Sequence, residues 1–255
     1  QNVTYDAAMQ RYIGNDPTPQ ITGDTMASRP IAVYDTVSGV TTKLVEDTST
    51  AAGKFYTDLS TTLVDGTHNF TARVKNANGL VSPASAPAAY LLDTVQPGGM
   101  ITQPVVPSGS QSAVLTSNKP VFTANATDGG SGVKQVMFQC ASKAAATSWQ
   151  TISTDYAPEP GTTTYAAVWP TTGQFSAGLT EGQYLLRVVI TDNVGNERIP
   201  ATVDVTLDVT QPTVEITSPD VSGVFYTESG MPTFTATATD PAGTSLPASG
   251  IAAVQ

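Results

Sequence analysis

The sequence predicts an all-β protein made of tandem β-sandwich domains, and three observations carry this prediction. Its 18 Pro and 21 Gly are spread along 255 residues and leave little room for long helices. Thr, Ser and Val dominate, and these residues suit pleated, half-buried surfaces. The segment Leu-Asp-Thr-Val-Gln-Pro at 92–97 returns as Leu-Asp-Val-Thr-Gln-Pro at 207–212, so that Asp208 follows Asp93 after 115 residues. A period of this length indicates repeated whole domains.

Further matches define three domains. Residues 120–128 match 232–240, and Ser-Gly-Val at 131–133 matches Ser-Gly-Ile at 249–251. We therefore expect one domain over 1–97, a second over 98–211 and the first part of a third over 212–255. Short linkers containing Pro97 and Pro212 have little conformational freedom, so the array is expected to be extended.

Composition excludes several classes of function. The net charge is −10, from 21 acidic and 11 basic residues, and this argues against nucleic-acid partners, whose phosphates need Lys and Arg clusters. No apolar run approaches the ~20 residues that span a bilayer. Cys140 is the only cysteine, so no internal disulfide can form. Because the chain begins with Gln and carries no signal peptide, we expect a processed product or an excised piece.

Alternating apolar residues and turn signals give the first domain about seven short strands. Residues 7–12 are either one helical turn or an irregular edge strand. Asp65-Gly66 is a strong turn signal, and His68, Phe70, Ala72 and Val74 share one face of the strand that follows. The expected strands are 3–5, 21–23, 31–35, 40–45, 53–59, 68–74 and 80–92. Turns every 8–12 residues are typical of a β-sandwich.

The motifs of this domain resemble a known class of repeat. They are Gly-Asn-Asp-Pro-Thr-Pro at 14–19, Val-Tyr-Asp at 33–35, Gly-Lys-Phe at 53–55, Leu-Val-Asp-Gly-Thr-His-Asn-Phe-Thr-Ala at 63–72, Asn-Gly-Leu-Val-Ser at 78–82 and Asp-Thr-x-x-Pro at 93–97. This spacing is similar to that of bacterial immunoglobulin-like repeats of large biofilm-associated adhesins. The resemblance implies tandem Ig-like β-sandwiches and an extracellular location at a bacterial cell surface. The family has an Asp-x-x-Gly-Asn turn before its last strand, whereas Asn76 to Gly79 stand here.

The second domain is expected to share this fold. Gly173-Gln174-Phe175 repeats Gly53-Lys54-Phe55, and 184–188 repeats 70–74 in pattern. The expected strands are 100–103, 119–127, 133–140, 148–154, 163–169, 183–191 and 197–208. The third domain should hold only its first three strands, which cannot close a sandwich. Truncation is the first explanation. The alternatives are that the ordered part of the chain ends there or that a strand of another chain completes the sheet.

Calcium is the best-supported ligand. In an Ig-like sandwich the entering linker and two loops lie at the same pole. In the second domain these places carry Asp93, Asp128 and Asp192, with Asn196 alongside. Three carboxylates at one pole repel unless a cation or solvent screens them, and Ca²⁺ prefers hard oxygen ligands. Asp208 and Asp240 repeat the pattern at the next junction. The alternative is that these Asp side chains only cap their own turns.

Catalysis is poorly supported, so we expect no enzyme activity. A nucleophile–His–acid triad would have to use His68, the only histidine, which more simply packs beside a turn. Cys140 ends an apolar strand and is expected to be a buried, inert thiol. A second hypothesis is a glycan- or protein-binding module, for which Trp149, Trp169, Tyr156 and Tyr165 are the aromatic candidates. A third is the accessory region of a secreted enzyme.

The sequence therefore favours a structural stalk or spacer of a bacterial cell-surface protein, such as an adhesin, surface layer or fibre. Its expected partners are the neighbouring Ig-like domains of the same chain and like chains in a surface assembly. Calcium at the domain junctions would stiffen the array.

Overall fold

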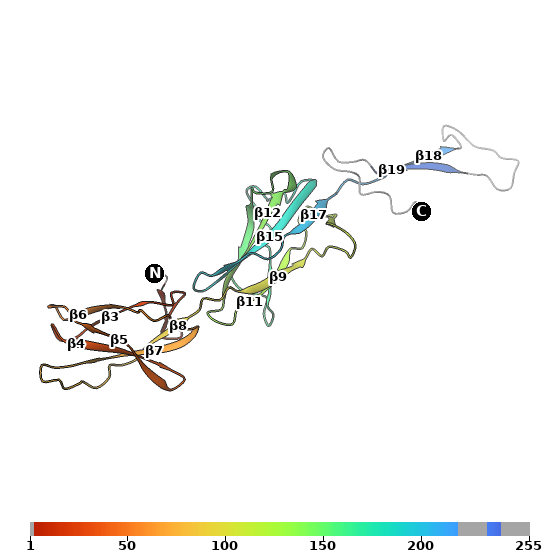
Figure 1. The fold of residues 1–255 in the computed structure, drawn as a ribbon. Coiled ribbons are helices and arrows are strands. Elements are labelled where there is room, and N and C mark those ends of the chain that lie inside the picture. The colour runs from red at the N-terminus through yellow and green to blue at the C-terminus, as the bar shows by residue number, and fades with distance from the viewer. Residues whose placement is uncertain (1–2, 219–233, 241–255) are drawn as a thin grey trace. The chain divides into compact units, whose positions relative to one another are not determined.

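A computed structural model describes residues 3–218 and 234–240 (Figure 1). The described chain is built from β-strands, and its helical content is one short 3-10 turn, Lys143–Ala145. The predicted all-β class of sandwich domains is thereby confirmed. The chain divides into two compact units: unit 1 comprises 1–99, 126–135 and 190–198, and unit 2 comprises 100–125, 136–189 and 199–255. The domain bounds 1–97, 98–211 and 212–255 stay sequence-based predictions.

The first sandwich has two sheets of unequal size. Its strands are β1 (Val3–Asp6), β2 (Arg11–Gly14), β3 (Gln20–Asp24), β4 (Pro30–Val37), β5 (Val40–Thr48), β6 (Lys54–Asp58), β7 (Gly66–Val74) and β8 (Ala88–Leu92). The larger sheet has the order β1-β2-β8-β7-β4-β5. The smaller sheet is the pair β3-β6, whose strands lie side by side in Figure 1. Two apolar clusters, Ile31 with Val33 and Phe55, and Leu59 with Phe70, Tyr90 and others, form the core.

Local sequence explains most of these strands. Ser38 and Gly39 both have positive φ, at 50° and 82°, and so form the tight two-residue turn that joins β4 to β5. Residues 7–10 form a turn, so the open choice at 7–12 resolves into the end of a β1–β2 hairpin. Strand β2 then pairs in parallel with β8.

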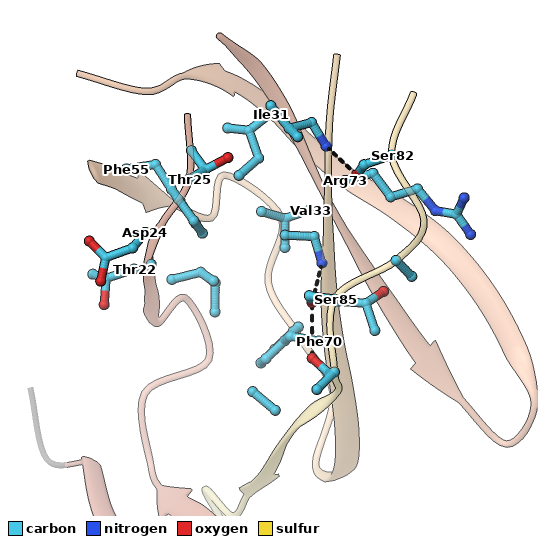
Figure 2. Close-up of a pocket in the computed structure, with 18 of the residues that line it drawn as sticks. Thr22, Asp24, Thr25, Ile31, Val33, Phe55, Phe70, Arg73, Ser82 and Ser85 are labelled. Atoms are coloured by element: carbon cyan, nitrogen blue, oxygen red, sulfur yellow. Dashed lines mark hydrogen bonds between the residues drawn. The ribbon is translucent and has the colours of Figure 1, made fainter. Parts of the chain in front are cut away.

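The single strand predicted over 80–92 is wrong, because only Ala88–Leu92 is a strand. Pro83 and Pro87 have no N–H to donate to a ladder. Serine hydroxyls partly replace that ladder beside β7. Ser82 Oγ accepts the Val74 N–H at 3.1 Å, and Ser85 Oγ accepts the Ala72 N–H at 3.0 Å (Figure 2). The Ser82 and Ser85 N–H groups in turn donate to the carbonyls of Val74 and Ala72, each at 2.9 Å, so this part of β7 is bonded by two serines rather than by a continuous strand.

The second sandwich repeats this plan. Its strands are β9 (Gly98–Gln103), β10 (Ala113–Leu115), β11 (Thr123–Thr127), β12 (Val133–Ser142), β13 (Gln150–Asp155), β14 (Thr164–Ala166), β15 (Gly182–Asp192), β16 (Glu197–Arg198) and β17 (Val203–Leu207). One sheet has the order β10-β17-β15-β12-β13, with β16 beside β15, and the other has the order β14-β11-β9. Phe122 and Phe138 meet edge to face in its core, with ring centroids 4.9 Å apart.

Two predicted elements of this sandwich need correction. The strand expected over 197–208 is split into β16 and β17, because Pro200 interrupts the ladder between them. Strand β10, which sequence reasoning missed, is only three residues long and pairs in parallel with β17. It is equivalent to β2 beside β8 in the first sandwich, so the two sandwiches share this parallel pairing.

The third predicted domain is described only in part. Strands β18 (Thr213–Ser218) and β19 (Thr235–Thr239) pair antiparallel. The third strand expected there lies outside the described residues. None of the described helical segments has the length and apolar character to cross a bilayer.

Candidate metal centre

Three of the predicted acidic residues come together inside unit 1. Asp93, Asp128 and Asp192 each offer one carboxylate oxygen, and these oxygens all lie within 4.8 Å of one another. Two oxygens bound at about 2.4 Å to one Ca²⁺ can be at most about 4.8 Å apart. The spacing of the three oxygens therefore matches ligands of a single ion.

Asp93 is fixed from both sides of its carboxylate. It follows β8, and its own N–H donates to the Gly14 carbonyl at 3.0 Å. Its Oδ1 accepts the Val95 N–H at 3.2 Å, and its Oδ2 accepts the Ser131 N–H at 2.6 Å. This side chain consequently joins the linker to the loop that contains Asp128.

Asp128 is held within its own loop. Its Oδ2 accepts the Gly130 N–H at 3.1 Å and the Gly132 N–H at 2.7 Å. Gly132 has a φ of 87°, which L side chains rarely adopt, so glycine is required for this turn. Asp128 thus caps its turn, as the alternative hypothesis expects, and still contributes an oxygen to the cluster.

Asp192 shapes the loop between β15 and β16. Its Oδ1 accepts the N–H groups of Val194, Gly195 and Asn196 at 3.0, 2.7 and 2.8 Å. Asp192 itself is fully buried. The side chain of Val194 packs with Ile13 and Leu91, and this contact holds the loop against the first sandwich strands.

Asn196 presents its amide nitrogen to the cluster. Its Nδ2 donates to Asp192 Oδ2 at 2.7 Å and to the carbonyls of Asp93 and Val95 at 2.9 and 3.2 Å. Its Oδ1 accepts from Asn15 Nδ2 at 3.2 Å. In this geometry Asn196 ties the linker to the loop, and a ligand role would need its amide oxygen and nitrogen to exchange places.

The cluster carries negative charge with little compensation. Asp93 and Asp192 are only 1% and 0% exposed, and none of the salt bridges found among the described residues involves Asp93, Asp128 or Asp192. Burial raises the pKa of Asp128, and the charges of Asp93 and Asp192 raise it further, against the Gly132 and Gly130 N–H groups. Buried carboxylates are costly unless a counter-charge is present, so the donor set fits a hard divalent cation.

Gly130 keeps this arrangement open, and its substitution is a test. A Cβ at Gly130 would lie 2.5 Å from Asp93 Oδ2 and 2.6 Å from Oδ1. Gly130→Ala should therefore displace the Asp93 carboxylate without changing any charge, and weaken calcium binding by at least tenfold in calorimetry. Gly129→Ala is the matched control, because a Cβ there meets nothing within 4 Å. Equal calcium affinity of both variants would contradict this geometry.

The second predicted junction is not assembled in the described part of the chain. Asp208 Oδ1 accepts the Thr210 N–H at 3.1 Å. No group of three metal-ligating side chains among the described residues includes Asp208 or Asp240. Their role as calcium ligands stays a prediction.

Sequence reasoning missed a buried pair at the only histidine. His68 Nδ1 lies 2.6 Å from Asp35 Oδ2, and Nε2 lies 2.8 Å from the Val64 carbonyl oxygen. Both side chains are buried. The sequence signal is weak, because Asp35 and His68 are 33 residues apart and meet only through the β4–β7 pairing. Both ring nitrogens are used in contacts that stabilise the fold.

The remaining candidates do not form a site. Burial raises the pKa of Cys140 to about 11, so its thiol is unreactive at neutral pH. Trp149 stacks under Arg187 at 4.1 Å, Trp169 donates its ring N–H to the Pro120 carbonyl, and Tyr165 is buried. Tyr156 is exposed. Among the described residues no ring contact joins any two of these four aromatic residues.

Comparisons with known proteins give structural likenesses only. No protein-family model matches the chain. No curated protein matches it. A structure of Clostridium thermocellum CbhA fibronectin(III)-like modules is 18% identical, with a TM-score of 0.39, over 80% of this chain and 93% of that one.

Two further structures are similar at the same level. A tetra-tandem repeat from the extending region of a large adhesion protein is 20% identical, with a TM-score of 0.36, over 86% of this chain and 51% of that one. The structure of the chicken CNTN1 FN1–FN3 domains is 12% identical, with a TM-score of 0.33, over 76% of this chain and 69% of that one. Similarities this weak carry no functional inference.

Proposed function

We propose that the chain is a load-bearing spacer segment of an extracellular cell-surface protein, stiffened by Ca²⁺ bound at Asp93, Asp128 and Asp192. The observation that carries this proposal is the convergence of three carboxylates from a linker and two loops within 4.8 Å. The three segments are already joined by hydrogen bonds from Ser131 and Asn196 to Asp93.

A bound cation would supply the positive charge that the buried carboxylates lack. The linker then carries Asp93 as one ligand, so bending it away from the loops would require breaking bonds to the ion. The hydrogen bonds of Asn196 to the Asp93 and Val95 carbonyls hold the linker backbone in place beside that ligand. A linker fixed in this way transmits tension instead of folding back, which is what a spacer needs.

Thermal unfolding tests the calcium part of the proposal. Calcium at 100 times its dissociation constant should stabilise the chain by about 2.7 kcal/mol relative to EDTA. Asp128→Asn should change the melting temperature in opposite directions in EDTA and in calcium. In EDTA the variant should melt at the same or a higher temperature than the wild type, because a repelling charge is removed. In calcium it should melt lower, because a ligand is lost.

The raised pKa of Asp128 sets the sign of the pH dependence in EDTA. The protonated Asp128 carboxyl is favoured in the folded state, so its contribution to stability is present at acid pH and is lost as the pH rises through the folded-state pKa. The metal-free wild type should therefore be relatively more stable at acid pH. Asp58→Asn, at an exposed carboxylate of the same unit, is the control for Asp128→Asn. It should leave the melting temperature unchanged both in EDTA and in calcium. A wild-type melt that chelation leaves unmoved would remove the calcium proposal.

Mechanical and binding experiments test the spacer role itself. In single-molecule stretching, calcium should raise the unfolding force of the wild type and leave Asp128→Asn unchanged. A glycan array and pull-downs with the whole chain should be negative. Specific glycan binding that is lost on Trp149→Ala would instead favour the binding-module hypothesis, because Trp149 is partly exposed and its ring stacks with the Arg187 guanidinium.

A further inference from the structure

The smaller sheet of the first sandwich has an unpaired edge. Thr25 N–H donates to the Gly53 carbonyl, in register with the β3–β6 pairs. Hydrogen-bonded pairs alternate along an antiparallel ladder, so Gly23 bonds to Phe55 and Ile21 to Thr57. The backbone groups of Thr22 and Asp24 therefore point away from β6. Among the described residues no strand pairs with them.

An apolar groove runs along this edge. Two cavities of about 370 and 400 Å³ adjoin each other beside β3, because both are lined by Ile21, Thr22, Phe70 and Ala88. Figure 2 shows Thr22 and Asp24 on one side of the first cavity and Ser82 and Ser85 on the other. Core side chains, including Ile31, Val33 and Phe55, line it.

The second sandwich shows what fits such an edge. There, β11 is equivalent to β3 and β14 to β6, and a third strand, β9, pairs with the other edge of β11. Met100 N–H donates to Asn125 Oδ1 at 2.9 Å, and the hydroxyls of Thr102 and Thr123 are 2.8 Å apart. In the first sandwich the strand before β2 is β1, which pairs with β2 and not with β3.

We propose that the β3 edge is a strand-addition site for an extended, uncharged segment of another polypeptide, of the same type as β9. Backbone groups of the added strand would pair with Thr22 and Asp24, and its alternate apolar side chains would enter the groove. Charge supports this occupant. The only charged residues lining the two cavities are Asp24, which is paired with Lys54 at 2.7 Å, and Arg73, whose guanidinium lies over the Tyr34 ring. The segment 98–103 likewise carries no charge.

Peptide binding to the whole chain tests the proposal. The probe is a fluorescent peptide with the sequence Gly-Gly-Met-Ile-Thr-Gln of 98–103. Two N-methylated versions of this peptide are compared with it. Because the N–H groups of successive residues point to opposite edges of a strand, methylating alternate residues blocks one edge in the first version and the other edge in the second. An added strand pairs through one edge only, so one version should bind at least tenfold more weakly and the other about as well as the parent. Equal binding of all three, or no binding of the parent at millimolar concentration, would overturn the proposal.

Variants at Thr22 test the same contact from the side of the protein. Thr22→Pro removes an N–H that does not bond to β6, and it should weaken peptide binding about tenfold. Thr22→Ala, which keeps the N–H, is the matched control and should bind like the wild type. Circular dichroism melts check that both variants fold. Equal loss of binding in both would mean that the groove recognises the Thr22 side chain and not the strand edge, and would contradict strand addition.

Discussion

Replacing His68 by Ala should lower the free energy of unfolding by about 3–5 kcal/mol, the cost of leaving a buried charge without its partner. Asp35 Oδ2 would lose a contact of 2.6 Å from His68 Nδ1, while its Oδ1 would keep only the Asn69 N–H at 3.2 Å. The Val64 carbonyl would lose its contact with Nε2. Chemical denaturation of the variant and the wild type measures the difference.

The chemistry of the ring explains the size of this effect. Both nitrogens of His68 face oxygen acceptors, and a neutral imidazole has only one N–H. Both contacts are hydrogen bonds when one proton lies between Nδ1 and the Asp35 carboxylate and a second proton lies on Nε2. His68 and Asp35 then form a buried hydrogen-bonded pair that fastens the turn at Val64 to β4.

A double-mutant cycle supplies the control. Asp35→Ala alone should cost about as much as His68→Ala, and the double variant should cost much less than the two single losses together, because no charge is left unpaired. Thr67→Ala, on the exposed face of the same strand, should change stability by less than about 0.5 kcal/mol. Additive losses in the cycle would show that the pair is not coupled.

Replacing Asp192 by Ala should cost about 3–5 kcal/mol in calcium and about 1–2 kcal/mol in EDTA. The larger loss combines the bound cation with the three backbone N–H groups that Oδ1 accepts. In EDTA the loss of these hydrogen bonds is partly offset, because repulsion with Asp93 and Asp128 disappears. Denaturation curves in the two conditions separate the two contributions.

Asp204→Ala is the matched control for this variant. Asp204 belongs to the same sandwich and forms a surface ion pair with Lys143 at 2.9 Å. Its loss should cost less than about 1 kcal/mol, equally in calcium and in EDTA. If Asp192→Ala showed the same small and calcium-independent cost, the three carboxylates would not act as a cation site.

The gathering of Asp93, Asp128 and Asp192 could be predicted because it follows from topology. The repeat places one Asp in the linker and one in each of two loops, and a sandwich brings those places to one pole. The orientation of Asn196 could not be predicted, because its amide is set by Asn15, 181 residues away along the chain. The His68–Asp35 pair was missed for the same reason: its partner lies across a strand pairing, not nearby in sequence.

Strand boundaries failed where backbone donors are missing or strands are very short. Pro83 and Pro87 interrupt the ladder that the apolar pattern of 80–92 predicts, and the hydroxyl and N–H groups of Ser82 and Ser85 take its place. Strand β10 has only three residues, too few to show alternation. The unpaired edge of β3 also could not be predicted from the sequence. It depends on whether the first strand of the sandwich, β1, pairs with β3 or with β2.

The three carboxylates belong to segments 35 and 64 residues apart along the chain, from Asp93 to Asp128 and from there to Asp192. They meet only when β8, β11 and β15 are already in place, and because such non-local contacts form slowly, we expect the cluster to form late in folding. Calcium should therefore leave the refolding rate nearly unchanged and slow the unfolding rate instead. For the proposed surface spacer, the lifetime of the folded state would then follow the calcium concentration of its surroundings.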